Sequence, residues 1–344
     1  MPPTAMPDSC CAPGIMQQPA EPDAEPELDP VFTALLADPR IELRPPSAAI
    51  SIGDLRRGAT AFLTRATGPD LHEVRSLTTD DGVASVATRL YRPSAQQGLP
   101  VILFIHGGGF VFGSLDTHDS MCRTLAEETG AALLAVDYRC APEAVFPAAA
   151  DDCLRALRWV RDNAVRLGLD RDRIALAGDS AGGQLAVVTA MRAREEDIAL
   201  RHLALFYPLA DPSCSTASSH RFARGFMLSR AFVQWCWTSY AGNNGVCRGN
   251  PFFDLTIADL RGLPPTTIIT AGHDPLRDEG EALADRIEQA GSAVSRRRYP
   301  GMIHGFAGLP QITPIAIDAL RYASMSLKDA LAHDGPGASI RPEA

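Results

Sequence analysis

Lysine is nearly absent from this chain of 344 residues, and basic residues as a group are in the minority. Lys328 is the only lysine, so arginine supplies almost all of the 32 basic side chains, against 41 acidic ones and a net charge of -9. A negative surface repels the phosphates of nucleic acids and the head groups of anionic membranes. The composition therefore predicts neither a nucleic-acid partner nor electrostatic binding to a membrane.

Long apolar runs are missing as well. No stretch of eighteen or more apolar residues occurs, and a transmembrane helix needs about twenty. Residues 1–30 contain neither the basic start nor the apolar centre of a secretory signal peptide. No apolar segment precedes Cys10 and Cys11, as it would before a lipoprotein cleavage site. We expect a cytoplasmic protein without a membrane anchor.

The eight cysteines lack the spacing of a metal site or of a redox pair. No two of them form a Cys-x-x-Cys pair, and none combines with histidine at the spacing of metal ligands. In a chain this long we expect free thiols that are mostly buried, and no bound metal.

Both ends of the chain differ in composition from the middle. Residues 1–27 are rich in proline, alanine and acidic residues, which predicts a disordered N-terminal tail, and residues 334–344 are expected to form a short C-terminal tail. After the first tail, apolar residues at helical spacing predict one helix within 28–36 and a second around 51–64.

Strand patterns begin after residue 70 and alternate with helical ones. The first two alternate apolar and polar residues, as at an antiparallel sheet edge, whereas 101–105 and 131–136 are continuous apolar runs typical of strands buried on both faces. This succession predicts an α/β fold with a mostly parallel, eight-stranded sheet flanked by helices. The strand segments are 71–79, 83–93, 101–105, 131–136, 173–178, 203–207, 266–272 and 294–300.

One stretch interrupts this alternation. Residues 208–265 show no strand pattern and are dense in phenylalanine, methionine and tryptophan. A long insertion between two strands of a sheet usually forms a lid or a binding element, and we expect the same here.

The sequence GDSAGG at 178–183 lies between a predicted strand and a predicted helix. A serine on such a turn adopts strained backbone angles, and small residues at Gly178 and Gly182 let strand and helix approach each other. The N–H of Ala181 would face an oxyanion formed at Ser180, beside the positive end of the helix dipole. The alternative is a glycine-rich turn with a solvated serine, but the strand-turn-helix context favours Ser180 as a nucleophile.

A second glycine-rich segment, HGGGF at 106–110, follows the strand at 101–105. Three consecutive glycines cost backbone entropy unless the main chain must approach another group closely. Exposed N–H groups there can stabilise the oxygen of a tetrahedral intermediate. A dinucleotide or phosphate loop would need further residues that do not follow here. We expect His106 to be structural, holding this loop.

The base is sought among the histidines after Ser180, because α/β hydrolases carry their triad in the order serine, acid, histidine. His304 follows the last predicted strand, at the end of the sheet where such folds place catalytic groups. His202 and His220 precede any candidate acid, and His333 lies beyond the last helix. His304 is therefore the predicted base.

The acid is expected after the strand at 266–272. Asp274 is the first carboxylate there, and its predicted task is to accept the Nδ1–H of His304 and fix the tautomer. Asp278 and Glu279 are rivals, but they lie where a helix begins, and helix capping explains carboxylates at that position.

Five motifs resemble those of the hormone-sensitive-lipase-like esterases, bacterial family IV. They are HGGGF, YRCAPE (138–143), GDSAGG, DPLRDEG and HGF, in this order, and the resemblance spans about residues 30–330. Cys140 departs from the family, which usually has leucine there, and we expect only a packing adjustment. Arg139 and Glu143 of the second motif are expected to be structural.

The resemblance implies an α/β-hydrolase core with a helical cap. The core would comprise 66–207 and 266–333, and the cap would comprise 28–65 and 208–265. The implied activity is hydrolysis of short- to medium-chain carboxylic esters, with a small-molecule ester as substrate and no cofactor. The implied site residues are the triad Ser180, Asp274 and His304 and the oxyanion donors Gly108, Gly109 and Ala181, with Gly107 as a further candidate.

Bulky side chains of the two cap segments are expected to wall a pocket of finite depth over the nucleophile. Each buried methylene group gains about 0.8 kcal/mol only while room remains, so butyryl to octanoyl esters should be preferred. The candidate pocket residues are Phe32, Phe226, Met227 and Trp235.

Two other functions stay open at this point. An amidase or formamidase would use the same triad, and a ligand receptor on this fold would use the pocket without catalysis. Such receptors tend to lose the base, so the presence of His304 argues against the second. For the oligomeric state, a homodimer is one alternative.

Overall fold

The structure is a computed structural model that describes residues 27–47, 50–80, 82, 84–243 and 245–332. The two predicted tails, 1–27 and 334–344, lie outside the described residues except for Glu27. Within these ranges, no helix combines the length and the apolar character needed to cross a bilayer.

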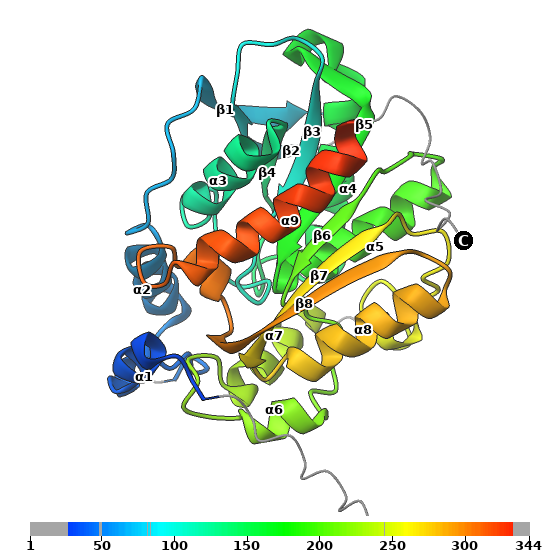
Figure 1. Ribbon diagram of the computed structural model, residues 1–344. Helices are drawn as coiled ribbons and strands as arrows, with labels where there is room; N and C mark the ends of the chain where they lie inside the picture. The colour runs from blue at the N-terminus through cyan, green and yellow to red at the C-terminus, as the bar shows by residue number, and fades with distance from the viewer. Residues whose placement is uncertain (1–26, 48–49, 81, 83, 244, 333–344) are drawn as a thin grey trace, which may run out of the picture.

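Eight strands form one sheet in the order β1-β2-β4-β3-β5-β6-β7-β8 (Figure 1). The first two pairings in this order are antiparallel, and every later pairing is parallel. The predicted fold class is therefore confirmed. The strands are β1 Glu73–Asp80, β2 Ser85–Arg92, β3 Leu99–Ile105, β4 Ala132–Asp137, β5 Leu169–Asp179, β6 Leu203–Phe206, β7 Thr266–His273 and β8 Val294–Ile303.

The central strands are buried on both faces, as their continuous apolar runs predict. In β3, Ile102 and Phe104 pack into one core cluster, whereas Val101, Leu103 and Ile105 pack into the other. Side chains of α3 (Asp119–Thr129) and α9 (Ile315–Ala332) belong to the first cluster. Those of α4 (Ala148–Asn163), α5 (Ala181–Glu195) and α8 (Arg277–Gln289) belong to the second.

The two segments outside the alternating pattern lie together, although they are far apart in the sequence. The first contains α1 (Pro30–Leu36), the short 3₁₀ helix η1 (Pro39–Ile41) and α2 (Ile52–Leu63), and the second contains α6 (Ala217–Arg221), α7 (Arg230–Ala241) and η3 (Leu255–Ile257). Figure 1 shows α1, α2, α6 and α7 gathered at one end of the sheet.

Backbone hydrogen bonds join these two segments. Leu43 and Leu228 form a parallel bridge, and the Leu43 N–H donates to the Met227 carbonyl at 2.7 Å. The Ser229 hydroxyl in turn donates to the Leu43 carbonyl at 2.7 Å. These hydrogen bonds join the segment after η1 to the segment before α7, and they satisfy backbone groups of both.

Candidate active site

The site is built around a sharp turn between β5 and α5. Ser180 occupies that turn with φ 53° and ψ -120°, a conformation that a residue with a side chain rarely adopts. Its N–H donates to the Phe206 carbonyl at 2.8 Å. A Cβ at Gly182 would collide with the Ile105 carbonyl oxygen, and one at Gly178 would collide with Gly182. The glycines therefore permit the close strand-helix approach that holds Ser180 in this conformation.

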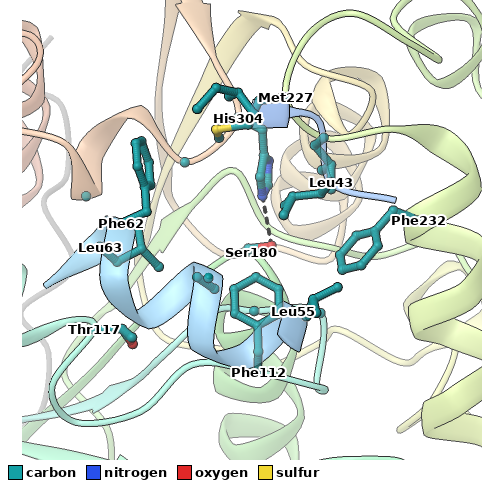
Figure 2. Close-up of a pocket in the computed structure, with 18 of the residues that line it drawn as sticks. Leu43, Leu55, Phe62, Leu63, Phe112, Thr117, Ser180, Met227, Phe232 and His304 are labelled. Carbon is teal, nitrogen blue, oxygen red and sulfur yellow. Dashed lines mark hydrogen bonds between the residues drawn. The ribbon is translucent and has the colours of Figure 1, made fainter. Parts of the chain in front are cut away.

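His304 and Asp274 lie beside this turn because they follow β8 and β7, which end at the same edge of the sheet. The His304 Nε2 lies 2.9 Å from the Ser180 Oγ (Figure 2). The His304 Nδ1 lies 2.8 Å from the Asp274 Oδ2. The other oxygen of Asp274 accepts the Leu276 N–H at 2.8 Å. Asp274 is fully buried, so its carboxylate has fixed partners on both oxygens.

The two rival carboxylates face other partners. Asp278 accepts the Ser218 N–H at 2.7 Å, while its own N–H donates to the Ser218 hydroxyl at 3.0 Å. Glu279 accepts the Ala210 N–H at 2.8 Å. Both carboxylates thus bind the start of the 208–265 insertion, and neither contacts His304.

The glycine loop after β3 approaches Ser180 with left-handed backbone angles. Gly108 has φ 114° and Gly109 has φ 60°. The Gly107 N–H is occupied, because it donates to Asp179 Oδ1 at 2.8 Å. Within the described part of the chain, the Gly108 and Gly109 N–H groups have no hydrogen-bond partner. Gly107 is therefore a poor candidate for an oxyanion donor, in contrast to the two glycines that follow it.

A buried cluster of polar side chains, formed by Thr117, His118 and Asp179, holds this loop in place. His118 Nε2 lies 3.3 Å from Asp179 Oδ1, and Thr117 Oγ1 lies 2.8 Å from His118 Nδ1. Burial alone would raise the pKa of Asp179, but His118 and the Gly107 N–H hold it below its ordinary value. Asp179, the neighbour of Ser180, is thus an ionised anchor for Gly107.

His106 is buried and holds the loop by stacking. Its ring lies 4.2 Å from the ring of Tyr138, whose hydroxyl donates to the His106 carbonyl at 3.0 Å. Burial lowers the pKa of His106 to about 3, so the imidazole is neutral at ordinary pH. A hydrogen bond joins Nδ1 to the Gly107 carbonyl at 2.8 Å. This geometry agrees with the structural role expected of His106.

A cavity of about 610 Å³ opens above Ser180 and His304. This volume is typical of sites for small organic molecules. Its walls are mainly apolar and come from the glycine loop, from α2, and from the start of α7. Figure 2 shows α2 crossing this pocket in front of Ser180. The apolar lining includes Leu43, Leu55, Phe62, Leu63, Phe112, Met121, Met227, Leu228 and Phe232.

Comparison with known proteins agrees with this geometry. Residues 102–308 match the model of a family described as having the alpha/beta hydrolase fold. The chain is 36% identical over 285 residues to the ethyl acetate hydrolase of Pseudomonas putida, covering 80% of this chain and 89% of the relative. It is 39% identical over 261 residues to the carboxylesterase NlhH of Mycobacterium tuberculosis, covering 73% and 80%. The crystal structure of a thermostable Pseudomonas putida esterase superposes with a TM-score of 0.83 at 34% identity, covering 91% of this chain and all of that one.

The chain belongs to the hormone-sensitive-lipase-like family of α/β hydrolases. Four of the family motifs quoted from the sequence lie at the ends of parallel strands of the sheet. HGGGF, DPLRDEG and HGF follow β3, β7 and β8 respectively, GDSAGG spans the turn from β5 to α5, and residues of all four line the cavity at Ser180.

The structure places only one of the four predicted pocket residues on the cavity wall. Met227 lines the pocket, but Phe32, Phe226 and Trp235 do not. Phe32 is fully buried in the core cluster that also contains side chains of α3 and α9. Phe226 stacks on His273 at 5.6 Å, and Trp235 packs on Phe232 at 5.4 Å. The prediction was wrong for these three. For Phe32 and Trp235 the reason is that apolar spacing on a helix marks a buried face without saying what covers it, whereas Phe226 lies between α6 and α7 and packs on His273 instead.

Residues that the sequence did not single out complete the pocket. Leu55, Phe62 and Leu63 line it from α2, and Phe112 lines it from the segment after the glycine loop. The predicted helix at 51–64 carried the signal for the first three, because their spacing of seven and eight positions puts them on one face. Phe112 lies two residues beyond HGGGF and had no distinguishing signal.

The described cysteines are mostly buried, as expected from the sequence. Six cysteines fall among the described residues, and all are free. Cys236 lines the pocket, and its side chain lies against Gly109. Burial raises the pKa of this thiol, which disfavours the reactive thiolate. Across the described ranges, no three His, Cys, Asp or Glu side chains form a group that could hold a metal ion.

We predict that Asp274→Asn lowers kcat by about 10³–10⁴-fold, because an amide cannot hold the His304 tautomer as a carboxylate does. The matched variant Asp278→Asn keeps an oxygen for the Ser218 N–H and should cost less than about tenfold. Initial rates on p-nitrophenyl acetate for both purified variants measure this difference. A larger loss for Asp278→Asn would show that Asp274 is not the partner of His304.

Glu279 predicts a pH dependence of stability. Burial raises the pKa of its carboxyl well above the ordinary 4.5, and among the described residues its Oε2 has no hydrogen-bond partner. As pH rises above 4.5, the unfolded chain releases this proton while the folded chain keeps it. The contribution of Glu279 to the free energy of unfolding is thus present at low pH and lost as pH rises through the folded pKa.

Glu279→Gln keeps an oxygen for the Ala210 N–H and cannot ionise, so its free energy of unfolding should rise relative to that of the unmodified protein as pH increases above 4.5. Urea titrations at several pH values measure this difference, with Glu127→Gln as the control at an exposed position. A constant difference between the Glu279 variant and the unmodified protein would contradict the raised pKa.

Proposed function

We propose that this protein is a serine carboxylesterase that cleaves short- to medium-chain esters through an acyl-serine intermediate. The observation that carries the proposal is the continuous hydrogen-bonded series from Ser180 through His304 to Asp274, with distances of 2.9 and 2.8 Å, beneath an apolar cavity. A nucleophile, a base and an orienting acid in this arrangement are the parts that acyl transfer needs.

In the first half of the reaction, His304 Nε2 takes the proton from Ser180 Oγ while that oxygen attacks the ester carbonyl carbon. The carbonyl oxygen becomes an oxyanion and accepts hydrogen bonds from the N–H groups of Gly108, Gly109 and Ala181. The intermediate then collapses, and His304 donates its proton to the departing alcohol. The products of this half are a free alcohol and an acyl group on Ser180.

In the second half, His304 takes a proton from water, whose oxygen attacks the acyl carbon. The bond to Ser180 Oγ breaks, the same proton returns to this oxygen, and a carboxylic acid leaves. Asp274 stabilises the imidazolium that forms twice in the cycle. Every proton transfer is made by a side chain of this protein, so the cycle runs without a cofactor.

The strained turn supports this assignment of Ser180. Because Ala181 is the first residue of α5, its N–H has no acceptor within the helix. The oxyanion site therefore combines the start of α5 with the glycine loop. The positive end of the α5 dipole adds a field that favours negative charge there.

An ester is favoured over an amide by the family relatives, which are named as ester hydrolases. The geometry alone would serve either substrate, because the triad and oxyanion donors are the same. The receptor alternative is disfavoured by the position of His304, which is within hydrogen-bonding distance of Ser180.

The proposal extends to the two segments beside the sheet. We assign 28–65 and 208–265 as a cap, because both contribute residues to the cavity above Ser180 and the Leu43–Leu228 bridge joins them. The core then comprises 66–207 and 266–333. A cytoplasmic location and a homodimer remain predictions.

The cavity volume supports a limit on chain length. A space of about 610 Å³ with mainly apolar walls accommodates an alkyl chain until its end is reached. Beyond that point further methylene groups meet the walls, and overpacking costs about 1–3 kcal/mol.

We predict that kcat/KM rises from acetyl to a maximum between butyryl and octanoyl esters and falls for longer chains. A series of p-nitrophenyl esters from acetate to palmitate measures this profile. Ser180→Ala is the blank and should show no turnover above the background of the ester alone. A monotonic rise to palmitate would contradict the limit on chain length, and turnover by Ser180→Ala would contradict the assigned nucleophile.

A further inference from the structure

The helix α2 contributes much of the pocket wall but is only partly buried. Leu55, Gly58, Ala59, Phe62 and Leu63 all line the cavity, and the apolar side chains Leu55, Phe62 and Leu63 pack against the core clusters without being fully buried. Burial of apolar side chains is what normally fixes a short helix on a protein surface. A second interaction adds to this partial apolar packing of α2 on the core.

That interaction is made by Arg56, whose side chain does not line the cavity. Its guanidinium binds both oxygens of Glu143, at 2.8 and 2.7 Å. It also donates to the carbonyl of Val111 at 2.8 Å and to that of Ala141 at 2.9 Å. One side chain of α2 thus makes four hydrogen bonds to two separate segments of the core.

These segments enclose the oxyanion loop. Val111 closes the turn after the glycines, since its N–H donates to the Gly108 carbonyl at 3.0 Å. Ala141 donates its N–H to the Phe110 carbonyl at 2.8 Å, which ties the YRCAPE segment to the same loop. The guanidinium of Arg56 therefore links α2 to the backbone that carries Gly108 and Gly109.

The neighbouring residue shows how an ordinary surface arginine of this helix behaves. The Arg57 side chain is 74% exposed and forms an ion pair with Asp54 of the same helix. The Arg56 side chain is only 32% exposed and crosses to the core. A single exposed ion pair contributes little, but a bidentate pair with two further carbonyl acceptors has a fixed geometry that only a guanidinium can satisfy.

We propose that Arg56 is a positioning residue that holds α2 over the pocket and thereby determines how well longer substrate chains are bound. The inference rests on the proposed function, because the chain in question belongs to an ester. With Arg56 in place, Leu55, Phe62 and Leu63 are held against the substrate. Without Arg56, α2 moves away, and the substrate loses the apolar contacts with α2 that stabilise each added methylene group.

Three single variants test this proposal. Arg56→Met keeps the apolar stem but removes every donor. Glu143→Gln keeps the two bonds from Arg56 to backbone carbonyls and weakens only the charged pair, so its effect should be smaller. Arg57→Met is the matched control, one position along the same helix. Two ester series are used, one varying the acyl chain and one varying the alcohol of an acetate ester.

For Arg56→Met we expect KM to rise about tenfold for the eight-carbon ester of one series, which is either the octanoyl ester or octyl acetate. This change corresponds to the loss of roughly two buried methylene groups. The kcat for the shortest ester should stay within about twofold, because the triad is intact. Hydrogen exchange of the peptide covering 52–63 should be faster in this variant, with exchange in α5 unchanged. Arg57→Met should match the unmodified protein in every measurement.

An equal loss for short and long esters in both series, or unchanged exchange in 52–63, would overturn the proposal, and so would an equal effect of Arg57→Met. If Arg56→Met does not fold, Glu143→Gln decides by the same criteria. If the unmodified protein turns over no ester, the proposed function is wrong, and the exchange comparison still decides whether Arg56 holds α2.

Discussion

The left-handed backbone of Ser180 is the constraint on which the rest of the site depends. A residue with φ 53° between β5 and α5 is strained, and it persists only because the surrounding structure fixes it. Gly178 and Gly182 remove the side chains that would prevent the strand and the helix from approaching. The result is a serine hydroxyl that projects from the end of the sheet toward the imidazole of His304.

The same turn also connects the nucleophile to the oxyanion loop. Asp179 precedes Ser180 and fixes the Gly107 N–H, so the glycines that follow are positioned relative to the serine itself. Arg56 donates to the Val111 carbonyl of the same loop and adds the cap helix α2 to the connected unit. Nucleophile, oxyanion donors and pocket wall are thus linked by hydrogen bonds.

Much of the fold could be predicted from the sequence, because the patterns of strands and helices lie within single segments. The pocket could not, because residues far apart in the sequence form it. Ser180, Asp274 and His304 could be named from the sequence alone, since each follows a strand and the parallel strands end at one edge. Phe32 could not be placed, because the same apolar spacing describes a residue facing the core and one facing a cavity. The Arg56–Glu143 pair joins positions 87 residues apart, and no local pattern indicates it.

The most direct test of the central claim is covalent labelling with diethyl p-nitrophenyl phosphate, followed by peptide mass spectrometry. The account predicts one diethylphosphoryl group per chain, on Ser180, with loss of esterase activity in proportion to labelling. His304→Gln should slow the labelling, because the serine then lacks its base. A label on another residue, or full esterase activity after complete labelling of Ser180, would contradict the account.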